Sequence, residues 1–328
     1  MGSWSWEPTV CIYHGNCLDG FGAAWAIWKR WPNCTFWPAY HGHDMPDIPD
    51  NQNVLFVDFS PPIDWIWKHS WKSKSMVIID HHKTAQADLE RLCSFDGSIE
   101  GLGHAFRTCW EQNGPELAAW FDMNQSGAMM AWQFAHGKIN RDALAGESVS
   151  RKIANDAPFL LQMVEDRDLW RFEFGETTRE VHAALRSYPL EFELWDKFEI
   201  DRIALISDGA AILRANMETV RQLVQQVAQC MVHAPDGTVL GPVPVVNAPY
   251  QFASDTGNAL LEAYPDAPFA VTWHMTGSEV SYSLRSDNSR QDVAAVAKLF
   301  GGGGHRNASG FKHHDRVFWI MASILHIT

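Results

Sequence analysis

The sequence contains no C-x-x-C pair, so it offers neither the spacing of a structural zinc site nor that of a redox dithiol. Its six cysteines are scattered over 328 residues, and we expect them to be reduced thiols. The first residues, MGSWSWEP, lack the basic and apolar regions of a signal peptide. They also fail the myristoylation pattern, because Trp6 stands where Ser or Thr is required. We therefore expect a soluble, cytoplasmic protein.

Long apolar runs and an excess of positive charge are also missing. The run VFWIMASIL near the C-terminus is too short to span a bilayer, so no membrane partner is expected. Acidic residues outnumber basic ones by 39 to 26, which gives a formal net charge of -13. This balance argues against a long DNA or RNA partner, because such affinity comes largely from neutralising phosphates. A small anionic substrate is still compatible if bound cations supply the positive field.

The first half of the chain alternates between strand and helix patterns. With 328 residues, of which 46% are hydrophobic, the chain is expected to form two domains. Strands are predicted at TVCIYH, CTFWPA, NVLFVDF and SMVIID, and helices at residues 19–31 and at PPIDWIWKHSW. Such alternation predicts an α/β domain with a parallel sheet covered on both faces.

The second half is predicted to hold a long helix and a smaller α/β domain. Helices are expected at MNQSGAMMAWQFAHG and APFLLQMVEDRDLWRF, and residues 201–232 carry a heptad-like apolar stripe. That stripe permits a coiled-coil homodimer, although a long helix packed between two domains is the more ordinary interpretation. Further strands are predicted at VPVVNA, PFAVTWHM and EVSYSLRS. The predicted organisation is a domain at 1–200, a linker helix at 201–232 and a domain at 233–328.

Polar residues follow three of the predicted strands at their carboxyl ends. His14 follows the first strand, Asp58 follows NVLFV, and the triplet 80–82 (DHH) ends SMVIID. Because the carboxyl ends of parallel strands meet at one edge of a sheet, these side chains are expected to lie together. Carboxylates combined with neutral imidazoles suit Mn, Fe or Zn. Two such ions can hold a bridging hydroxide and clamp the oxygens of a phosphoryl group.

Five motifs give the sequence a family resemblance. In chain order they are HGNCLDGFGAA, VDFS, DHH, EDRDLW and GGGGHRNASGF. Together they resemble the DHH phosphoesterase superfamily, in the branch that carries a C-terminal DHH-associated domain with a GGGH motif. The resemblance covers nearly the whole chain. It implies an N-terminal parallel-sheet DHH catalytic domain and a C-terminal substrate-binding domain, and it disfavours a family II pyrophosphatase, which lacks the GGGH domain.

The resemblance also implies a role for each residue of these motifs. The implied metal ligands are His14, Asp19, Asp58, His81 and Asp166. Asp58 would bridge two Mn²⁺ ions, with Co²⁺ or Mg²⁺ as alternatives. His82 would face the substrate phosphate, and Asp80 would orient an imidazole from outside the metal shell.

Two positions leave alternatives open. Asp168 competes with Asp166 for the fourth-motif role, and we favour Asp166 because Trp170 then follows it at the family's distance. The commonest first motif has two acidic residues one apart after the His, whereas this chain has only Asp19. Cys17 is either a soft thiolate ligand in place of the missing acid or a buried thiol beside a loosely held ion.

The glycine-rich motif is predicted to bind the substrate. Its backbone N–H groups would be exposed and would cradle an anion, as Gly-rich loops can. Arg285 could then make a bidentate contact to phosphate. The implied substrate-binding residues are Arg285, Gly302, Gly303, Gly304 and His305.

The function that these patterns favour is hydrolysis of short oligonucleotides to mononucleotides by a metal-dependent, nano-RNase-like phosphodiesterase. A phosphodiesterase for cyclic mono- or dinucleotides is the alternative with the same chemistry. A non-catalytic nucleotide-binding regulator is the alternative of a different class, suggested by the missing first-motif acid. An exonuclease for long strands is disfavoured, because it would need an extended basic groove.

Overall fold

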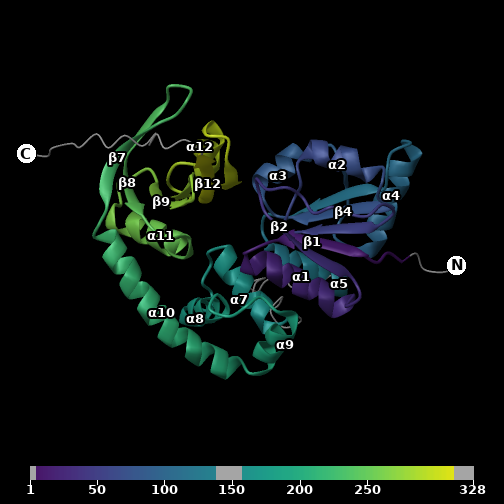
Figure 1. Cartoon of the computed structure of the whole chain (residues 1–328), viewed down its shortest axis with the longest axis horizontal. Coiled ribbons are helices and arrows are strands. Elements are labelled where there is room, and N and C mark those ends of the chain that lie inside the picture. The colour runs from purple at the N-terminus through teal and green to yellow at the C-terminus, as the bar shows by residue number, and fades with distance from the viewer. Residues whose placement is uncertain (1–4, 138–156, 314–328) are drawn as a thin grey trace, which may run out of the picture. The chain divides into compact units, whose positions relative to one another are not determined.

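The computed structural model describes residues 5–137 and 157–313 of the chain (Figure 1). The chain divides into two compact units, Met1–Leu213 and Arg214–Thr328, and the division falls inside helix α10 (Arg202–Val224). Each unit contains a six-stranded sheet. The predicted α/β class with a second, smaller α/β unit is thereby confirmed, whereas the functional domain limits at 1–200, 201–232 and 233–328 stay predictions.

The sheet of the first unit is parallel throughout, with the strand order β2-β1-β3-β4-β6-β5. Its strands are β1 (Val10–His14), β2 (Thr35–Ala39), β3 (Asn53–Val57), β4 (Ser75–Asp80), β5 (Cys93–Ser94) and β6 (Leu117–Phe121). The chain runs from β1 to one neighbour, β2, and then returns to β3 on the other side. The carboxyl ends of β1 and β3 therefore flank a topological switch point, where open α/β sheets bind ligands.

Helices cover both faces of this sheet, as Figure 1 shows. The helices described in this unit are α1 (Leu18–Arg30), α2 (Ile63–Ser70), α3 (Lys83–Asp88), α4 (Ile99–Glu111), α5 (Gly127–His136), α7 (Phe159–Asp168), α8 (Glu176–Leu185) and α9 (Phe192–Ile200). Of these, α8 and α9 pack against α7. The sequence patterns predicted α1, α2, α5 and α7. They did not resolve β5, β6, α4, α8 or α9, because the segment from 97 to 200 mixes short apolar runs without one clear period.

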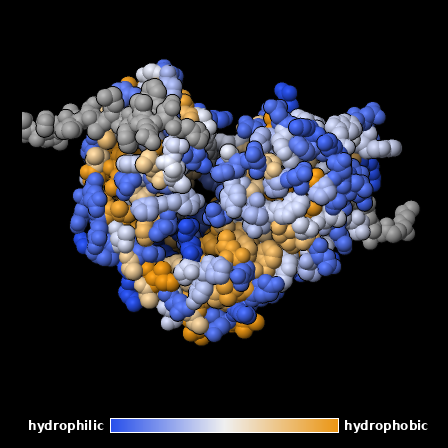
Figure 2. All heavy atoms as spheres, in the orientation of Figure 1, coloured by the Kyte–Doolittle hydropathy of each residue, from blue (hydrophilic) through white to orange (hydrophobic). Residues whose placement is uncertain are grey.

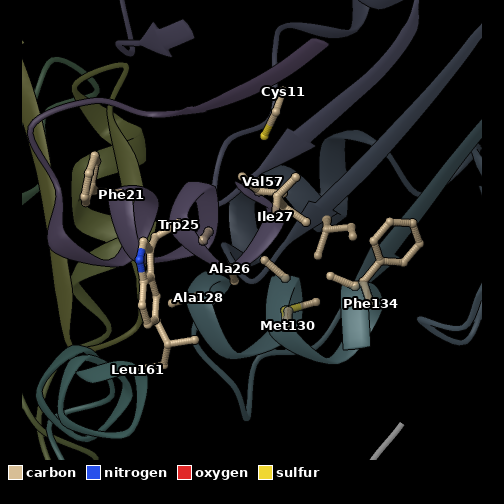
Figure 3. Close-up of a cluster of buried hydrophobic side chains, with 14 of the residues drawn as sticks. Cys11, Phe21, Trp25, Ala26, Ile27, Val57, Ala128, Met130, Phe134 and Leu161 are labelled. Carbon is tan, nitrogen blue, oxygen red and sulfur yellow. The ribbon is translucent and has the colours of Figure 1, made fainter. Parts of the chain in front are cut away.

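The core of the first unit follows from residues that alternate along fully buried strands. In β3, Leu55 and Val57 pack toward α1 and α5, while Val54 and Phe56 pack on the opposite face. A strand that is buried on both faces reads as a continuous apolar run, which is how NVLFV and SMVII appear in the sequence. Figure 3 shows the larger cluster, with Trp25 and Ile27 of α1 near Met130 and Phe134 of α5. This packing fixes α1 and α5 against the strands whose ends carry the polar residues.

The second unit has a mixed sheet with the order β11-β12-β10-β9-β8-β7, in which only β8 and β9 pair in parallel. Its strands are β7 (Ala228–His233), β8 (Val239–Asn247), β9 (Ala270–Thr276), β10 (Glu279–Arg285), β11 (Gly303–His305) and β12 (Ala308–His313). Its helices besides the end of α10 are the 3₁₀ turn η2 (Tyr250–Phe252), α11 (Ala253–Ala263) and α12 (Val293–Leu299). The three strands predicted after residue 233 are all present, as β8, β9 and β10.

The predicted linker helix is too long at its C-terminal end. Helix α10 ends at Val224, and the residues from 228 onward form β7 instead. In that strand Cys230 and Val232 are buried while their neighbours are more exposed. The buried residues of this segment therefore follow a period of two, and Met231, the last residue of the predicted helical stripe, lies between them and is only partly buried. Pairing with β8 makes the segment a strand.

Among the described residues, every helix is too short or too polar to cross a membrane. Hydrophilic residues cover most of the visible face of each unit in Figure 2.

Candidate active site

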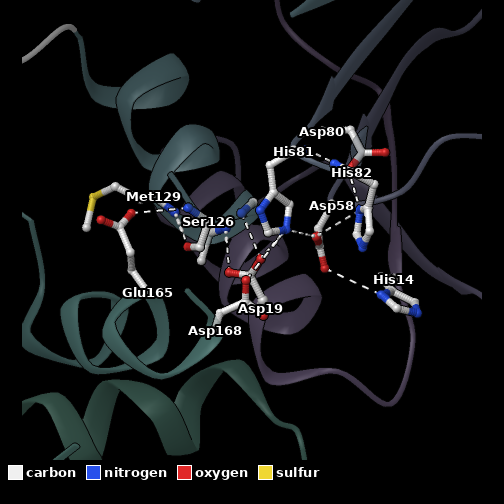
Figure 4. Close-up of polar contacts among 12 residues, drawn as sticks. His14, Asp19, Asp58, Asp80, His81, His82, Ser126, Met129, Glu165 and Asp168 are labelled. Atoms are coloured by element: carbon white, nitrogen blue, oxygen red, sulfur yellow. Dashed lines mark hydrogen bonds and ion pairs between the residues drawn. The ribbon is translucent and has the colours of Figure 1, made fainter. Parts of the chain in front are cut away.

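Asp58 lies at the centre of a polar cluster at the carboxyl ends of β1, β3 and β4 (Figure 4). Its side chain is 1% exposed, and its Oδ1 lies 3.1 Å from Nε2 of His81. The other oxygen, Oδ2, lies 3.5 Å from Nδ1 of His14 and has no hydrogen-bond partner. The backbone of Asp58 has a φ of 53°, which is uncommon for residues other than glycine. A buried carboxylate in such a conformation indicates a functional constraint.

Asp19 is held by the N-terminus of helix α5. Its carboxylate accepts hydrogen bonds from the backbone N–H groups of Gly127 at 2.7 Å and Ala128 at 2.9 Å. The helix dipole also favours a negative charge at that end. Asp19 Oδ2 lies 3.3 Å from Nε2 of His81. Gly127 is required at this place, because a Cβ there would lie 2.4 Å from the Cβ of Asp58.

The side chains of the Asp-His-His triplet at the end of β4 make two different sets of contacts. Nε2 of His81 faces Asp19 and Asp58, and the side chain is buried. Asp80 turns the other way: its Oδ1 lies 2.7 Å from Nδ1 of His82, and its Oδ2 accepts a hydrogen bond from Ser60 at 2.6 Å. Asp80 therefore orients the ring of His82, and the role that the resemblance implies for it beside a metal shell stays a prediction.

The structure corrects the prediction for Asp166. Its carboxylate accepts hydrogen bonds from the backbone N–H of Glu173 at 2.8 Å and of Phe174 at 3.2 Å, and from the hydroxyl of Thr178. Asp166 thus ties the loop after α7 to α8 and does not reach the cluster. Asp168, its rival, brings Oδ2 to 3.7 Å from Nε2 of His81. The fourth-motif carboxylate of the cluster is therefore Asp168.

His41, in the turn after β2, was not among the predicted residues. Its ring stacks on Phe59, with centroids 4.6 Å apart, and lies 5.2 Å from the ring of His14 and 6.2 Å from that of His82. It thus borders the cluster from the side of β2. A signal existed in the sequence, because the segment YHGHD places imidazoles just after a third strand whose carboxyl end meets the same edge.

Burial and mutual contact shift the pKa values of these groups. Burial would raise the pKa of Asp58, but its close contacts with His14 and His81 and the charge of the neighbouring imidazoles outweigh that effect and hold the pKa well below its usual range. The same balance, with His82 as the main partner, lowers the pKa of Asp80 to about 2. Burial would lower the pKa of His81, yet hydrogen bonds to Asp19 and Asp58 raise it well above its usual value.

Asp168 is shifted in the opposite direction. Desolvation by the surrounding groups and the negative charge of Asp19 raise its pKa to about 7, although the Asp168 side chain is still 29% exposed. Burial likewise raises the pKa of the Cys17 thiol, and the charges of Asp58 and Asp19 add to that effect. Asp168 and Cys17 therefore hold their protons more tightly than usual, because their negative charges would add to those of the carboxylates beside them.

The residues present fit a pair of divalent cations. Asp19, Asp58 and His81 are buried and bring ligand atoms to within 4.8 Å of one another, and His14, Cys17 and Asp58 form a second such group. Asp58 belongs to both groups, and its two oxygens face different imidazoles, Oδ2 lying 3.5 Å from His14 and Oδ1 lying 3.1 Å from His81. A carboxylate shared in this way, with carboxylate and imidazole partners on both sides, matches the donor set of two-metal sites. Mn²⁺, Co²⁺ and Mg²⁺ stay predictions for the ion.

Metal binding is expected to strengthen as the pH rises. Asp168 and His81 have raised pKa values, so the stability that their protons confer on the metal-free fold is present at low pH and is lost as the pH rises through those values. A cation must displace the same protons, which weakens its binding by about tenfold per pH unit for each proton displaced. We expect saturating Mn²⁺ to raise the Tm more at about pH 8 than at about pH 6. Equal increments in a thermal-shift titration at the two pH values would contradict this prediction.

In the second unit, backbone hydrogen bonds and close packing account for glycines of the GGGGH motif. The backbone N–H groups of Gly301 and Gly302 donate to Lys298 and Ala297 at the end of α12, at 3.1 and 2.9 Å. The prediction that they are exposed to an anion is therefore wrong. A Cβ at Gly302 would lie 2.1 Å from the carbonyl oxygen of Gly310, so the strand β12 requires glycine there.

The other predicted substrate residues belong to the same unit. Gly303, Gly304 and His305 form β11, which pairs with β12. The guanidinium of Arg285 donates to Ser254 at 2.6 Å and to the carbonyl oxygen of Leu284 at 2.8 Å. Arg285 is thus held against the start of α11, and its contact with a phosphate stays a prediction.

No family model matches the chain. One curated protein is similar in sequence over most of the chain. It is the uncharacterized protein R106 of Acanthamoeba polyphaga mimivirus, with 27% identity over 324 residues, which cover 93% of this chain and 67% of that protein. Its name assigns no activity.

Two solved structures illustrate the comparison of folds. One is described as the pGpG-specific phosphodiesterase PggH from Vibrio cholerae, with 11% identity, 93% of each chain covered and a TM-score of 0.41. The other is described as a DHH domain of a member of the s1p family of ribosomal proteins, with 14% identity, 93% of this chain and 82% of that chain covered, and a TM-score of 0.48. At such TM-scores the likeness carries no argument about the activity of this chain.

Proposed function

We propose that this chain is a DHH-type phosphodiesterase that hydrolyses short oligonucleotides with the help of two divalent cations. The observation that carries the proposal is the position of Asp58. It presents one oxygen to His81 and the other to His14, at the switch point of a parallel sheet. The DHH motif, the first-motif His and Asp, and the fourth-motif Asp168 surround that single carboxylate.

Each residue of the cluster would have a separate role in binding the cations or the substrate. His14, Asp19, Asp58, His81 and Asp168 would hold the cations. When bound, such ions lower the pKa of water and neutralise charge on a phosphoryl group. His82, whose ring Asp80 fixes and whose pKa Asp80 raises against the effect of burial, would donate a hydrogen bond to a phosphate oxygen. His41 borders the same space and would limit how much substrate can approach from the side of β2.

The acidic character of the chain favours a short substrate. With a net charge of -13, the protein attracts polyanions poorly, so the attraction for a phosphodiester must come from the cations and from single residues such as His82. A dinucleotide needs only such a local field. A cyclic mono- or dinucleotide would satisfy the same argument, and it is the competing substrate in the test.

The test is a hydrolysis assay with Mn²⁺ on four substrates: a 5′-phosphorylated RNA dinucleotide, a long oligoribonucleotide, 3′,5′-cyclic AMP and a cyclic dinucleotide. We expect the dinucleotide to be cleaved fastest and the long strand slowest. We expect EDTA or His81→Ala to abolish turnover, while His104→Ala, at an exposed site on α4, leaves it unchanged.

Each alternative has its own result in this assay. Preferential opening of a cyclic substrate would assign the chain to cyclic-nucleotide hydrolysis. Turnover that rises with strand length and falls steeply with salt would indicate a long-strand exonuclease. Binding of nucleotide without turnover of any substrate, in a chain shown to contain metal, would support the non-catalytic regulator.

A further inference from the structure

Cys17 occupies a position that neither helix capping nor core packing explains. It is the N-cap residue of α1, where Ser, Thr, Asp and Asn are preferred because their oxygens accept a backbone N–H. The side chain of Cys17 makes no such cap hydrogen bond. Within the described residues, it also belongs to none of the buried hydrophobic clusters, unlike Cys11, Cys34 and Cys230. The interpretation of Cys17 as a core thiol therefore has no support from its surroundings.

The sulfur instead faces two other candidate ligands. Sγ of Cys17, a ring nitrogen of His14 and a carboxylate oxygen of Asp58 lie within 4.8 Å of one another. His14 ends β1 and Cys17 directly precedes α1, so the short turn between them directs both side chains to the end of β3. One imidazole, one sulfur and one carboxylate oxygen are a usual donor set for a transition metal.

An independent observation points to a cation at the same place. Oδ2 of Asp58 is buried and, although it lies 3.5 Å from Nδ1 of His14, it accepts no hydrogen bond. A buried carboxylate oxygen without a hydrogen bond is costly, and a metal ion is one partner that removes the cost. This is the Asp58 oxygen on the side of His14, away from the oxygen that faces His81.

We propose that Cys17 binds one of the two metal ions as a thiolate, together with His14 and Asp58. This inference deepens the proposed function, on which it rests for the presence of two ions. On binding, the thiol proton passes to a solvent base, a water leaves the ion and a sulfur–metal bond forms, with no change of oxidation state. The two positions then differ in chemistry. The one with Cys17 prefers softer ions such as Zn²⁺, Fe²⁺ or Co²⁺, and the one with Asp19 and Asp168 accepts Mn²⁺ or Mg²⁺.

The experiment loads the purified full-length chain with Co²⁺ and records its near-ultraviolet and visible absorption together with the bound metal per chain. Thiolate-to-cobalt charge transfer gives a near-ultraviolet band that carboxylate and imidazole ligands do not give. We expect two ions per chain and this band in the parent protein. Cys17→Ser should lose the band and bind one of its two ions at least about 100-fold more weakly, the upper range for loss of an indirect contact. Cys93→Ser, at another partly buried cysteine, should change neither readout.

A second variant keeps the inference open to refutation if Cys17→Ser folds poorly. Cys17→Asp supplies the missing first-motif acid, so we expect two ions without the charge-transfer band and a shift of preference from Co²⁺ toward Mn²⁺. A band that survives in both Cys17 variants, or two bound Co²⁺ ions without a band in the parent protein, would overturn the inference.

The outcomes for the inference and for the proposed function are separable. A parent protein that hydrolyses the dinucleotide and binds two ions without the band keeps the function and refutes the thiolate. A parent protein that shows the Cys17-dependent band but hydrolyses no phosphodiester keeps the thiolate and refutes the function.

Discussion

Asp58→Asn is expected to reduce the hydrolysis rate by at least about 10³-fold, because loss of several kcal/mol of charge stabilisation at a two-metal site costs a factor of ten for each 1.36 kcal/mol. Asp58 is the residue that both ligand groups share. Its replacement should therefore weaken binding at both positions, whereas changes at His14 or His81 should each affect mainly one. Asn suits this test because, like Asp, it tolerates the positive φ at position 58.

The measurement is the number of Mn²⁺ ions bound per chain by titration calorimetry, together with the initial rate of dinucleotide cleavage. Asp88→Asn is the matched control, because Asp88 is exposed at the end of α3 and lies outside the cluster. Circular dichroism confirms that the variant is folded. A folded Asp58→Asn protein that still binds two ions with unchanged affinity would remove Asp58 from the site.

Asp166→Asn is expected to lower the free energy of unfolding, whereas Asp168→Asn is expected to lower the affinity for Mn²⁺. At Asp166 the amide replaces a buried carboxylate that accepts two backbone N–H bonds and a hydroxyl bond. Hydrogen bonds to charged groups contribute about 1.5–3 kcal/mol each, and the amide retains part of them, so a loss of about 2–4 kcal/mol in the free energy of unfolding follows. Mn²⁺ affinity should change little in the protein that stays folded.

At Asp168 the change removes a carboxylate whose pKa is raised to about 7 by desolvation and by Asp19. The metal-free Asp168→Asn protein should therefore be at least as stable as the parent protein at neutral pH. Its Mn²⁺ affinity should fall about 100-fold or more, since even indirect partners of metal sites contribute 10–100-fold. Chemical denaturation measures the free energy of unfolding of both variants, and metal titration measures their Mn²⁺ affinity. Loss of metal affinity in Asp166→Asn with unchanged stability would restore the original assignment.

Much of the first unit could be predicted because its strands are buried on both faces. Runs such as NVLFV and SMVII carry no polar interruption until they end, and the polar residue that ends each of them marks the carboxyl edge of the sheet. The segment from 97 to 200 was predicted less completely. The apolar faces of its helices α4, α8 and α9 pack against residues from distant parts of the chain, so no local pattern marks them clearly.

In the site, too, some residues could be placed from the sequence and others only from the tertiary packing. Asp58, His81 and His82 follow their strands directly, so their common edge follows from the parallel sheet. Asp166 and Asp168 stand two residues apart on α7, which separates their side chains by about 200° around the helix axis. Which of them faces the strands depends on how α7 packs against α1 and α5, and no local pattern records that packing.

By itself, the sequence determined which chemical groups stand at the ends of the strands: a histidine that ends β1, an aspartate directly after β3 and an Asp-His-His triplet whose Asp ends β4. It determined this because a strand buried on both faces is readable from apolar runs alone. Only the tertiary structure decided that Asp168 joins the cluster while Asp166 ties down a loop, that Asp80 orients His82, and that Gly301 and Gly302 use their N–H groups within the fold. Those choices depend on contacts between residues far apart in the chain, which arise only when the helices pack on the sheets.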